Sequence, residues 1–207
     1  MSARAVLTGG AVLLAGCAAK PLPPVVRYAP TQACAQVPDI GGAIRLGPGK
    51  KSGETLSTPV TADTPCLAGG SDFSTPYIVY ALPSAIDNRV VEVGGMLEPQ
   101  RSFPATVATL DAAGKRVRTF ASELYLIRSD RYSVQFAPRA DERYVLVTVD
   151  PALVGISYDR VETGVNTTYI GTAYGAISWR SGADNMVSRS YSYEGTVLAT
   201  VFDKTEK

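Results

Sequence analysis

Cys17 stands where its thiol could be modified covalently. It ends the stretch Leu14-Ala15-Gly16-Cys17, in which small residues form a cleavage box directly behind an apolar run from Ala5 to Ala15. The run is too short for a membrane span and has the length of a secretory signal. A cysteine at the cut is typical of a lipobox: the thiol takes a diacylglycerol, residues 1–16 are removed, and the new amino terminus is acylated. We therefore expect a mature protein anchored by lipid. An ordinary signal peptide followed by a chance cysteine is the alternative.

The mature chain would begin with a proline-rich segment, residues 17–33. Four prolines lie between Ala18 and Ala33, where they block helix formation and favour an extended chain. Such a segment is predicted to be a tether with a reach of about 50 Å. Ala18 and Ala19 stand where an aspartate would favour inner-membrane retention of a bacterial lipoprotein. We expect the outer membrane, on its periplasmic or its outer face.

Cys34 and Cys66 remain as an even pair once Cys17 carries lipid. An exported protein meets an oxidising compartment, so we predict a disulfide between them. Two free thiols are the alternative. A metal site is less expected, because no third ligand-type residue lies near either cysteine in the sequence.

The absence of histidine and the even charge balance exclude several functions. Catalysis by a Ser-His-Asp or Cys-His set needs an imidazole, as do histidine-bound zinc and copper sites, and the chain has no histidine. The whole chain has 20 basic and 19 acidic residues, and the predicted cleavage removes Arg4. A surface without net charge does not attract a phosphate backbone, so we expect no nucleic-acid partner, and we expect no cofactor or metal.

The rest of the chain is divided into two segments by composition. Residues 34–74 are rich in Gly, Pro, Ser and Thr without a sustained period, which indicates an irregular lead-in held by the disulfide, with short edge strands at most at Ala43 to Leu46 and Leu56 to Val60. Residues 75–207 contain many short strand-like runs with turn signals between them, which predicts an all-β fold, a jelly-roll-like β-sandwich. The expected strands are Tyr77 to Leu82, Arg89 to Met96, Thr106 to Asp111, Arg116 to Ser122, Tyr132 to Phe136, Tyr144 to Asp150, Tyr169 to Tyr174, Ser188 to Tyr193 and Thr196 to Phe202.

Local details of these strands can also be predicted. Thr106 to Leu110 and Arg116 to Phe120 should form a hairpin, because Gly114 can take the positive φ that the turn needs. In that hairpin Arg116 and Arg118 are expected to point to water. Gly94-Gly95 indicates a strand bend or bulge, and residues 151–163 could hold a short helical turn.

No catalytic set is visible. A serine nucleophile would need a Gly-x-Ser-x-Gly elbow or a Ser-x-x-Lys pair, and neither occurs in a convincing context. Paired carboxylates of the glycosidase kind could still meet in space, but most acidic residues stand beside turns, where Asp and Glu are common. We expect no catalytic residue and no enzymatic activity.

Aromatic residues are the best candidates for a binding contact. Planar rings stack on sugar faces or anchor protein partners, although most are expected to pack within the sheets. The group of interest comprises Tyr158, Tyr169, Tyr174, Trp179, Tyr191 and Tyr193. Trp179, beside Arg180, is its strongest candidate for an exposed contact, and Tyr174, Tyr191 and Tyr193 are the further candidates.

The order of strand and turn motifs between Tyr77 and Asp150 resembles the maltose operon periplasmic protein family. The matching stretches are Tyr80-Ala81-Leu82-Pro83, Ser102-Phe103-Pro104, Arg143-Tyr144-Val145-Leu146-Val147-Thr148 and, more weakly, Asp150-Pro151-Ala152, Gly164 and Gly195-Thr196-Val197-Leu198. The resemblance implies a β-sandwich envelope protein that operon context associates with carbohydrate uptake, and it supplies no catalytic residues. The lipobox, the expected disulfide and the lack of a long Pro/Ala-rich extension depart from the family pattern.

Together these features predict a non-enzymatic outer-membrane lipoprotein that acts as an accessory or assembly partner of another outer-membrane or periplasmic protein. A carbohydrate-binding module that aids glycan uptake or surface attachment is the alternative. A hydrolase that uses two carboxylates is a third hypothesis.

Overall fold

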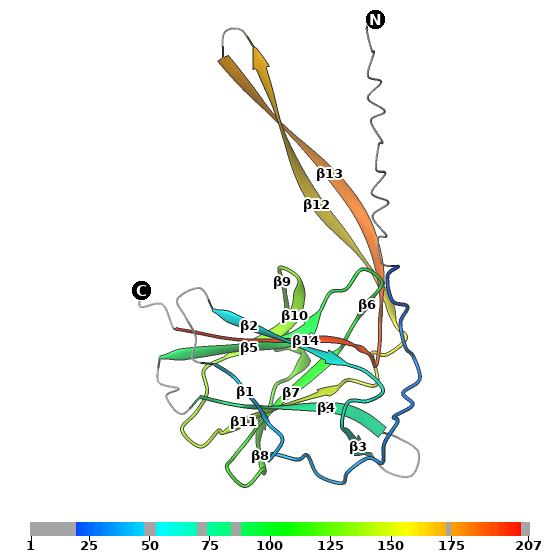
Figure 1. Cartoon of the computed structure of the whole chain (residues 1–207), viewed down its shortest axis with the longest axis vertical. Coiled ribbons are helices and arrows are strands. Elements are labelled where there is room, and N and C mark those ends of the chain that lie inside the picture. The colour runs from blue at the N-terminus through cyan, green and yellow to red at the C-terminus, as the bar shows by residue number, and fades with distance from the viewer. Residues whose placement is uncertain (1–19, 48–52, 70–73, 84–87, 173–174, 204–207) are drawn as a thin grey trace, which may run out of the picture.

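The computed structural model describes residues 20–47, 53–69, 74–83, 88–172 and 175–203. These residues form strands almost throughout, which confirms the all-β sandwich expected from the sequence. One short 3-10 turn, η1 (Ser122–Leu124), interrupts them. The two large sheets form the body of the molecule, and a third sheet extends away from it (Figure 1).

The strands of the six-stranded sheet run in the order β1-β4-β11-β7-β8, with β3 pairing β4. Their bounds are β1 (Ile44–Arg45), β3 (Cys66–Ala68), β4 (Ser74–Ala81), β7 (Ala105–Leu110), β8 (Arg116–Thr119) and β11 (Tyr144–Val149). The five-stranded sheet has the order β2-β14-β5-β10-β9. Its members are β2 (Glu54–Val60), β5 (Arg89–Met96), β9 (Leu126–Arg128), β10 (Arg131–Phe136) and β14 (Gly195–Asp203).

The main core lies between these sheets, because their strands alternate side chains from face to face. Val145 and Val147 of β11 point into it, as do Val91 and Val93 of β5 and Val197 of β14, all almost completely buried.

The opposite face of the six-stranded sheet is covered as well. Tyr77 and Val79 of β4 form a second cluster there with Leu110 and Leu146, and Ile40 and Leu67 pack against it.

The lead-in over residues 34–74 provides this cover and also adds strands to both sheets. β2 pairs along its whole length with β14, and β1 pairs with β4. The predicted disulfide is present: Cys34 and Cys66 are bonded, with their Cα atoms 4.6 Å apart. Cys66 opens β3, so the bond fixes the lead-in to the six-stranded sheet.

The β7–β8 hairpin forms as predicted, with Gly114 at φ +80° in its turn. The prediction that Arg118 points to water is wrong. Its guanidinium lies against the fully buried carboxylate of Glu142 and over the rings of Phe120 and Phe136. The orientation of the Arg118 side chain is decided by the buried carboxylate of Glu142. Glu142 lies outside the hairpin, so the alternation of side chains within the hairpin could not reveal it.

The glycine pair in β5 has a different role from the predicted bend or bulge. β5 pairs in continuous register with β10 and β14 through Gly94 and Gly95. A Cβ on Gly95 would collide with the carbonyl oxygen of Phe103, and one on Gly94 with the carbonyl oxygen of Tyr132. The pair is therefore needed for close approach of backbone to backbone.

The third sheet differs most from the prediction. Its strands are β6 (Arg101–Ser102), β12 (Ser157–Thr172) and β13 (Gly175–Tyr191), in the order β12-β13-β6. The helical turn considered for residues 151–163 is limited to hydrogen-bonded turns at residues 151–155, and strand begins at Ser157. Of the short strands expected at residues 169–174 and 188–193, residues 169–172 and 188–191 belong to the two long strands of one hairpin, and residues 173 and 174 lie outside the described residues.

Candidate functional site

The β12–β13 hairpin is the most distinctive feature of the surface. Its two strands pair without a break from Ser157↔Ser190 to Thr172↔Gly175. Figure 1 shows it rising away from the sandwich, whose two sheets it does not join. In the described residues, β12 pairs with no strand but β13, and β13 pairs besides with β6 at Ser190 and Tyr191. Among the residues that the structure describes, no strand therefore neighbours the outer edge of β13 over residues 176–189 or the outer edge of β12.

Apolar side chains stand exposed on both faces of this hairpin. Residues directly opposite in register point to the same face, so the pairing assigns each side chain to a face. Val161 and Met186 oppose each other on one face, with Val165 farther along, and we call these three the shaft patch. Their exposed fractions are 56%, 72% and 64%.

The other face carries Ile170 opposite Ile177 and, one step closer to the body, Trp179. All three are exposed, and so is Tyr169, which lies on the same face as the shaft patch. Residues 163–179 contain no Asp, Glu, Lys or Arg. We call Tyr169, Ile170, Ile177 and Trp179, within this uncharged stretch, the tip patch.

Charged residues are confined to the part of the hairpin closer to the body. Around the shaft patch stand Asp159, Asp184 and Arg180 on the same face. Asp159 accepts a hydrogen bond from Ser188, and Asp184 accepts one from Thr163 Oγ1 at 2.8 Å. A group of apolar side chains bordered by polar and charged ones is typical of a protein interface.

The base of the hairpin is held to the sandwich by a buried arginine. Arg189 is 6% exposed, and its Nε donates to the carbonyl oxygen of Glu98 at 2.6 Å. Its Nη2 donates to Glu162 Oε1 at 2.8 Å. The rings of Tyr158 and Tyr191 pack beside it with centroids 4.9 Å apart, and burial raises the pKa of Tyr191 to about 12. These contacts fix the direction in which the hairpin leaves the body.

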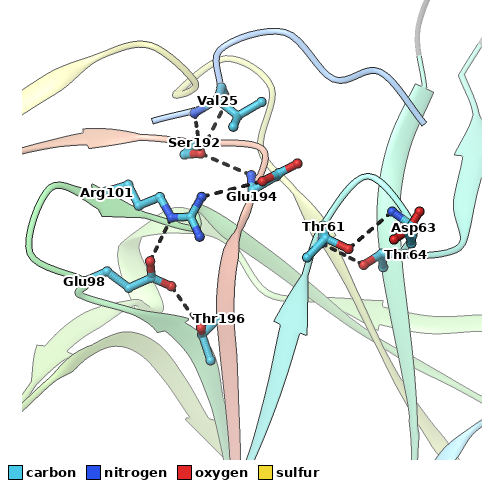
Figure 2. A network of polar contacts seen from close by, with 9 residues as sticks. All are labelled: Val25, Thr61, Asp63, Thr64, Glu98, Arg101, Ser192, Glu194 and Thr196. Atoms are coloured by element: carbon cyan, nitrogen blue, oxygen red, sulfur yellow. Dashed lines mark hydrogen bonds and ion pairs between the residues drawn. The ribbon is translucent and has the colours of Figure 1, made fainter. Parts of the chain in front are cut away.

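A second network lies where β13 leads into β14 (Figure 2). Arg101 Nε donates to Glu98 Oε2 at 2.7 Å, and its Nη1 lies 3.6 Å from Glu194. The other oxygen of Glu98 accepts a hydrogen bond from Thr196 at 2.9 Å. The network joins the β5–β6 loop to the turn after the hairpin, so it ties the hairpin base to the five-stranded sheet.

The proline-rich segment is attached at this same place. The Val25 N–H donates to Ser192 Oγ at 2.8 Å, and its carbonyl oxygen accepts from the Tyr193 N–H at 2.9 Å. The ring of Tyr28 stacks on that of Tyr193 with centroids 5.7 Å apart. From Val25 onward, the chain therefore lies on the body beside the hairpin base (Figures 1 and 2).

The aromatic residues singled out from the sequence do not form one platform. Trp179 is 65% exposed on the hairpin, Tyr191 packs at its base, and Tyr193 is buried in the core. Tyr174 lies outside the described residues, as does Cys17. The sequence pointed to Trp179 and Tyr169 as members of one aromatic group but not to their neighbours Ile170 and Ile177, since the strand pairing that places all four in one region was not apparent.

Carboxylates in the described parts of the chain have structural partners or stand apart. Glu92 accepts from Ser133 at 2.5 Å, Glu98 binds Arg101, and Glu142 binds Arg118. Each of four surface cavities among the described residues is lined by a single carboxylate, namely Asp39, Asp150, Glu54 or Glu92. None of these cavities therefore offers the acid pair that a two-carboxylate hydrolase needs.

The described residues also lack a metal-binding cluster and a helix that could span a membrane. They contain no cluster of three or more His, Cys, Asp or Glu side chains placed to hold a metal ion. Among the helices of those residues, none has the length and apolar character to cross a bilayer.

The chain was compared with family models, with curated proteins and with solved structures, and no match was found in any of the three. The resemblance to the maltose operon periplasmic protein family therefore stays a prediction, and the projecting hairpin stands as the candidate functional site on its own geometry.

Proposed function

We propose that this protein is a non-enzymatic, lipid-anchored accessory protein of the bacterial outer membrane that binds a protein partner of the envelope through its β12–β13 hairpin. The observation that carries the proposal is the exposure of the shaft patch on a hairpin with no second layer. Anchorage at Cys17 supports the location, since it would place the hairpin at a membrane.

The energetics of the hairpin favour a partner. A two-stranded hairpin is at best marginally stable alone in water, and three strands or a packed face are usually needed. β12 and β13 have 16 and 17 residues, and the hydrogen bonds of Arg189 fix only the base of this long hairpin. A protein surface over Val161, Val165 and Met186 would remove their apolar area from water and stabilise the extended arm.

The open edges provide a second mode of contact with the same partner. Backbone N–H and C=O groups along an unpaired edge can accept an added strand, as in many peptide-recognition domains. The edge of β13 over residues 176–189 runs beside the shaft patch. Strand addition there would supply backbone hydrogen bonds while the shaft patch supplies apolar contact.

The test is stoichiometric co-purification of a partner after mild detergent extraction of the tagged, acylated full-length protein. The variant is Val161→Lys combined with Met186→Glu, which places opposite charges across the pair and so keeps the hairpin register. We expect wild type to recover one partner in constant ratio and the double variant to recover at least tenfold less.

Leu124→Glu is the matched control, because Leu124 is a comparably exposed apolar residue, 54% exposed, on η1 of the body. It should recover the partner as wild type does. If wild type recovers no stoichiometric partner, or if the shaft variant recovers as much as wild type, the proposal is wrong. Mass spectrometry of the N-terminal peptide tests the anchor separately, by the presence of acyl chains on Cys17.

A further inference from the structure

The attachment of Val25 limits how far the body can lie from its anchor. Val25 is bound to Ser192 and Tyr193 at the hairpin base. It lies eight positions after Cys17, and a fully extended chain of eight residue steps spans about 28 Å. The lipid on Cys17 would hold the hairpin base within this distance of the bilayer surface.

This limit decides where the hairpin can point. A compact body of this size is about 37 Å across by the usual scaling of domain radius with length. The hairpin leaves the body at the end where Val25 is bound (Figure 1). If it pointed away from the bilayer, the whole body would lie between Val25 and the membrane, and the tether could not pass around it. The hairpin therefore points toward the bilayer or along it.

The hairpin is also longer than the tether. β12 has 16 residues, which at the rise of an antiparallel strand extend about 50 Å. An arm of this length on a base held within about 28 Å of the surface can bring its end to the lipid when it is inclined. Reach alone thus permits contact between the tip patch and the membrane that holds the anchor.

The chemistry of the tip patch selects lipid among the surfaces within reach. Residues 163–179 carry no charge, and Tyr169, Ile170, Ile177 and Trp179 are exposed on both faces of the strand pair. A protein groove would cover one face, whereas a lipid interface surrounds both. Trp and Tyr with aliphatic neighbours are the residues enriched at the level of lipid headgroups. The unpaired strand edges need hydrogen-bonding partners, so the tip would stay in the interface and not enter the hydrocarbon core.

From reach and chemistry together we infer that the tip patch inserts into the headgroup region of the same bilayer that holds Cys17. The inference rests on the lipid anchorage proposed above. The β12–β13 hairpin would then connect the body to the membrane at its far end, and the shaft patch would be left free for a protein partner. A partner bound there would have to lie at the membrane surface.

Trp179 is the only tryptophan of the chain, so its fluorescence reports the tip directly. The experiment uses the acylated full-length protein in vesicles of phosphatidylethanolamine and phosphatidylglycerol, compared with the Cys17→Ser protein in buffer. We expect Trp179 emission to shift to shorter wavelength, its quenching by acrylamide to fall at least threefold, and lipids brominated near the headgroup to quench it.

Two double variants separate this inference from the proposed function. Ile170→Lys with Ile177→Glu should return Trp179 to water while the protein still floats with vesicles. Val161→Lys with Met186→Glu changes the shaft patch by the same charges, and in vesicles without a partner it should leave Trp179 protected. Circular dichroism checks that each pair retains its strands.

Three results would overturn the inference. The first is an acylated protein that floats with vesicles while Trp179 remains as open to acrylamide as in buffer. The second is protection of Trp179 in native membranes but not in pure lipid vesicles, because a protein would then cover the tip. The third is a protein without acyl chains that does not float, in which case the anchorage fails as well.

Discussion

Val25 and Ser192, 167 positions apart, are joined by a hydrogen bond of 2.8 Å from the Val25 N–H to Ser192 Oγ. Ser192 is fully buried and comes directly after the last residue of β13. Its hydroxyl oxygen also accepts from the Glu194 N–H at 3.1 Å. One side chain thus connects the proline-rich segment with the turn that positions the hairpin.

Replacing this hydroxyl should release the segment that precedes the sandwich. Ser192→Ala leaves the Val25 and Glu194 N–H groups without their acceptor, a loss of about 1–3 kcal/mol at a part-buried site. We expect amide exchange in residues 20–30 to become at least tenfold faster, measured by hydrogen exchange with mass spectrometry. Exchange in β5 and β11 should be unchanged.

Ser178→Ala is the control for this change. Ser178 is an exposed serine on the hairpin, so its replacement should not affect exchange in residues 20–30. Equal exchange in all three proteins would mean that the hydroxyl does not hold the segment.

Arg118 and Glu142 form the ion pair with the most deeply buried carboxylate among the described residues. Arg118 Nε lies 2.7 Å from Glu142 Oε1, outside hydrogen-bond alignment, and Nη2 donates to Oε2 at 3.1 Å. Glu142 also accepts from Thr109 Oγ1 and from the Arg139 N–H. The carboxylate is fully buried, whereas the arginine is 23% exposed.

Removal of the arginine would leave that carboxylate buried without its counter-charge. We expect Arg118→Met to lower the free energy of unfolding by about 3 kcal/mol in urea denaturation. Adding Glu142→Gln should recover part of the loss, because the uncompensated charge is then gone. Arg116→Met, an exposed neighbour on β8, should change stability by less than about 0.5 kcal/mol. Similar losses for both single variants would contradict the importance of the pair.

The disulfide should contribute stability that grows with the logarithm of the length of the loop that it closes. Cys34 and Cys66 are 32 positions apart, and a loop of that length restricts the unfolded chain by about 3.7 kcal/mol in the chain-entropy treatment. Changing both to serine should lower the free energy of unfolding by about that amount. Alkylation of the native protein without reductant is the direct check: labelling of Cys34 or Cys66 would show free thiols and contradict the bond.

How well the sequence predicted each element depends on where its apolar residues lie. β4 and β11 were recognised because both their faces are buried, so their sequences are nearly continuous runs of apolar residues. The disulfide followed from the two cysteines that remain when Cys17 is set aside as the expected lipidation site. These features depend on local composition, which a single sequence displays.

The hairpin could not be recognised in the same way. Its apolar residues stand among Thr, Ser and Gly without the alternation that a core imposes, so only residues 169–174 and 188–193 were expected to form strands there. The hydrogen bond that holds the hairpin base joins Arg189 to the carbonyl oxygen of Glu98, which is 91 positions away. The sequence identified Trp179 as an exposed aromatic residue, but the tip patch exists only through the strand register.

Buried tyrosines should make the fold sensitive to alkali. Burial raises the pKa of Tyr80 to about 12 and that of Tyr125 to about 12, from 10.0. In the folded state the Tyr80 hydroxyl donates to Thr58 Oγ1 at 2.7 Å, whereas the Tyr125 hydroxyl oxygen accepts from the Val107 N–H at 2.7 Å. Both rings lie in the main core.

The sign of the effect follows from proton binding. Below pH 10 both states keep the phenol protons, so the full stability is present. Between pH 10 and 12 the unfolded chain loses these protons while the folded protein keeps them, and the free energy of unfolding must fall, by about 2.7 kcal/mol for each tyrosine. Urea denaturation at pH 9 and pH 11.5 measures the larger part of this fall, about 1.8 kcal/mol for each tyrosine. In Tyr125→Phe the free energy of unfolding should fall less between these two pH values, by about the contribution of one tyrosine. This difference does not depend on how stable the variant is at neutral pH. Tyr169→Phe, altered at a side chain that is 74% exposed on the hairpin, should fall as wild type does. An unchanged fall in Tyr125→Phe would mean that this phenol does not resist ionisation in the folded protein.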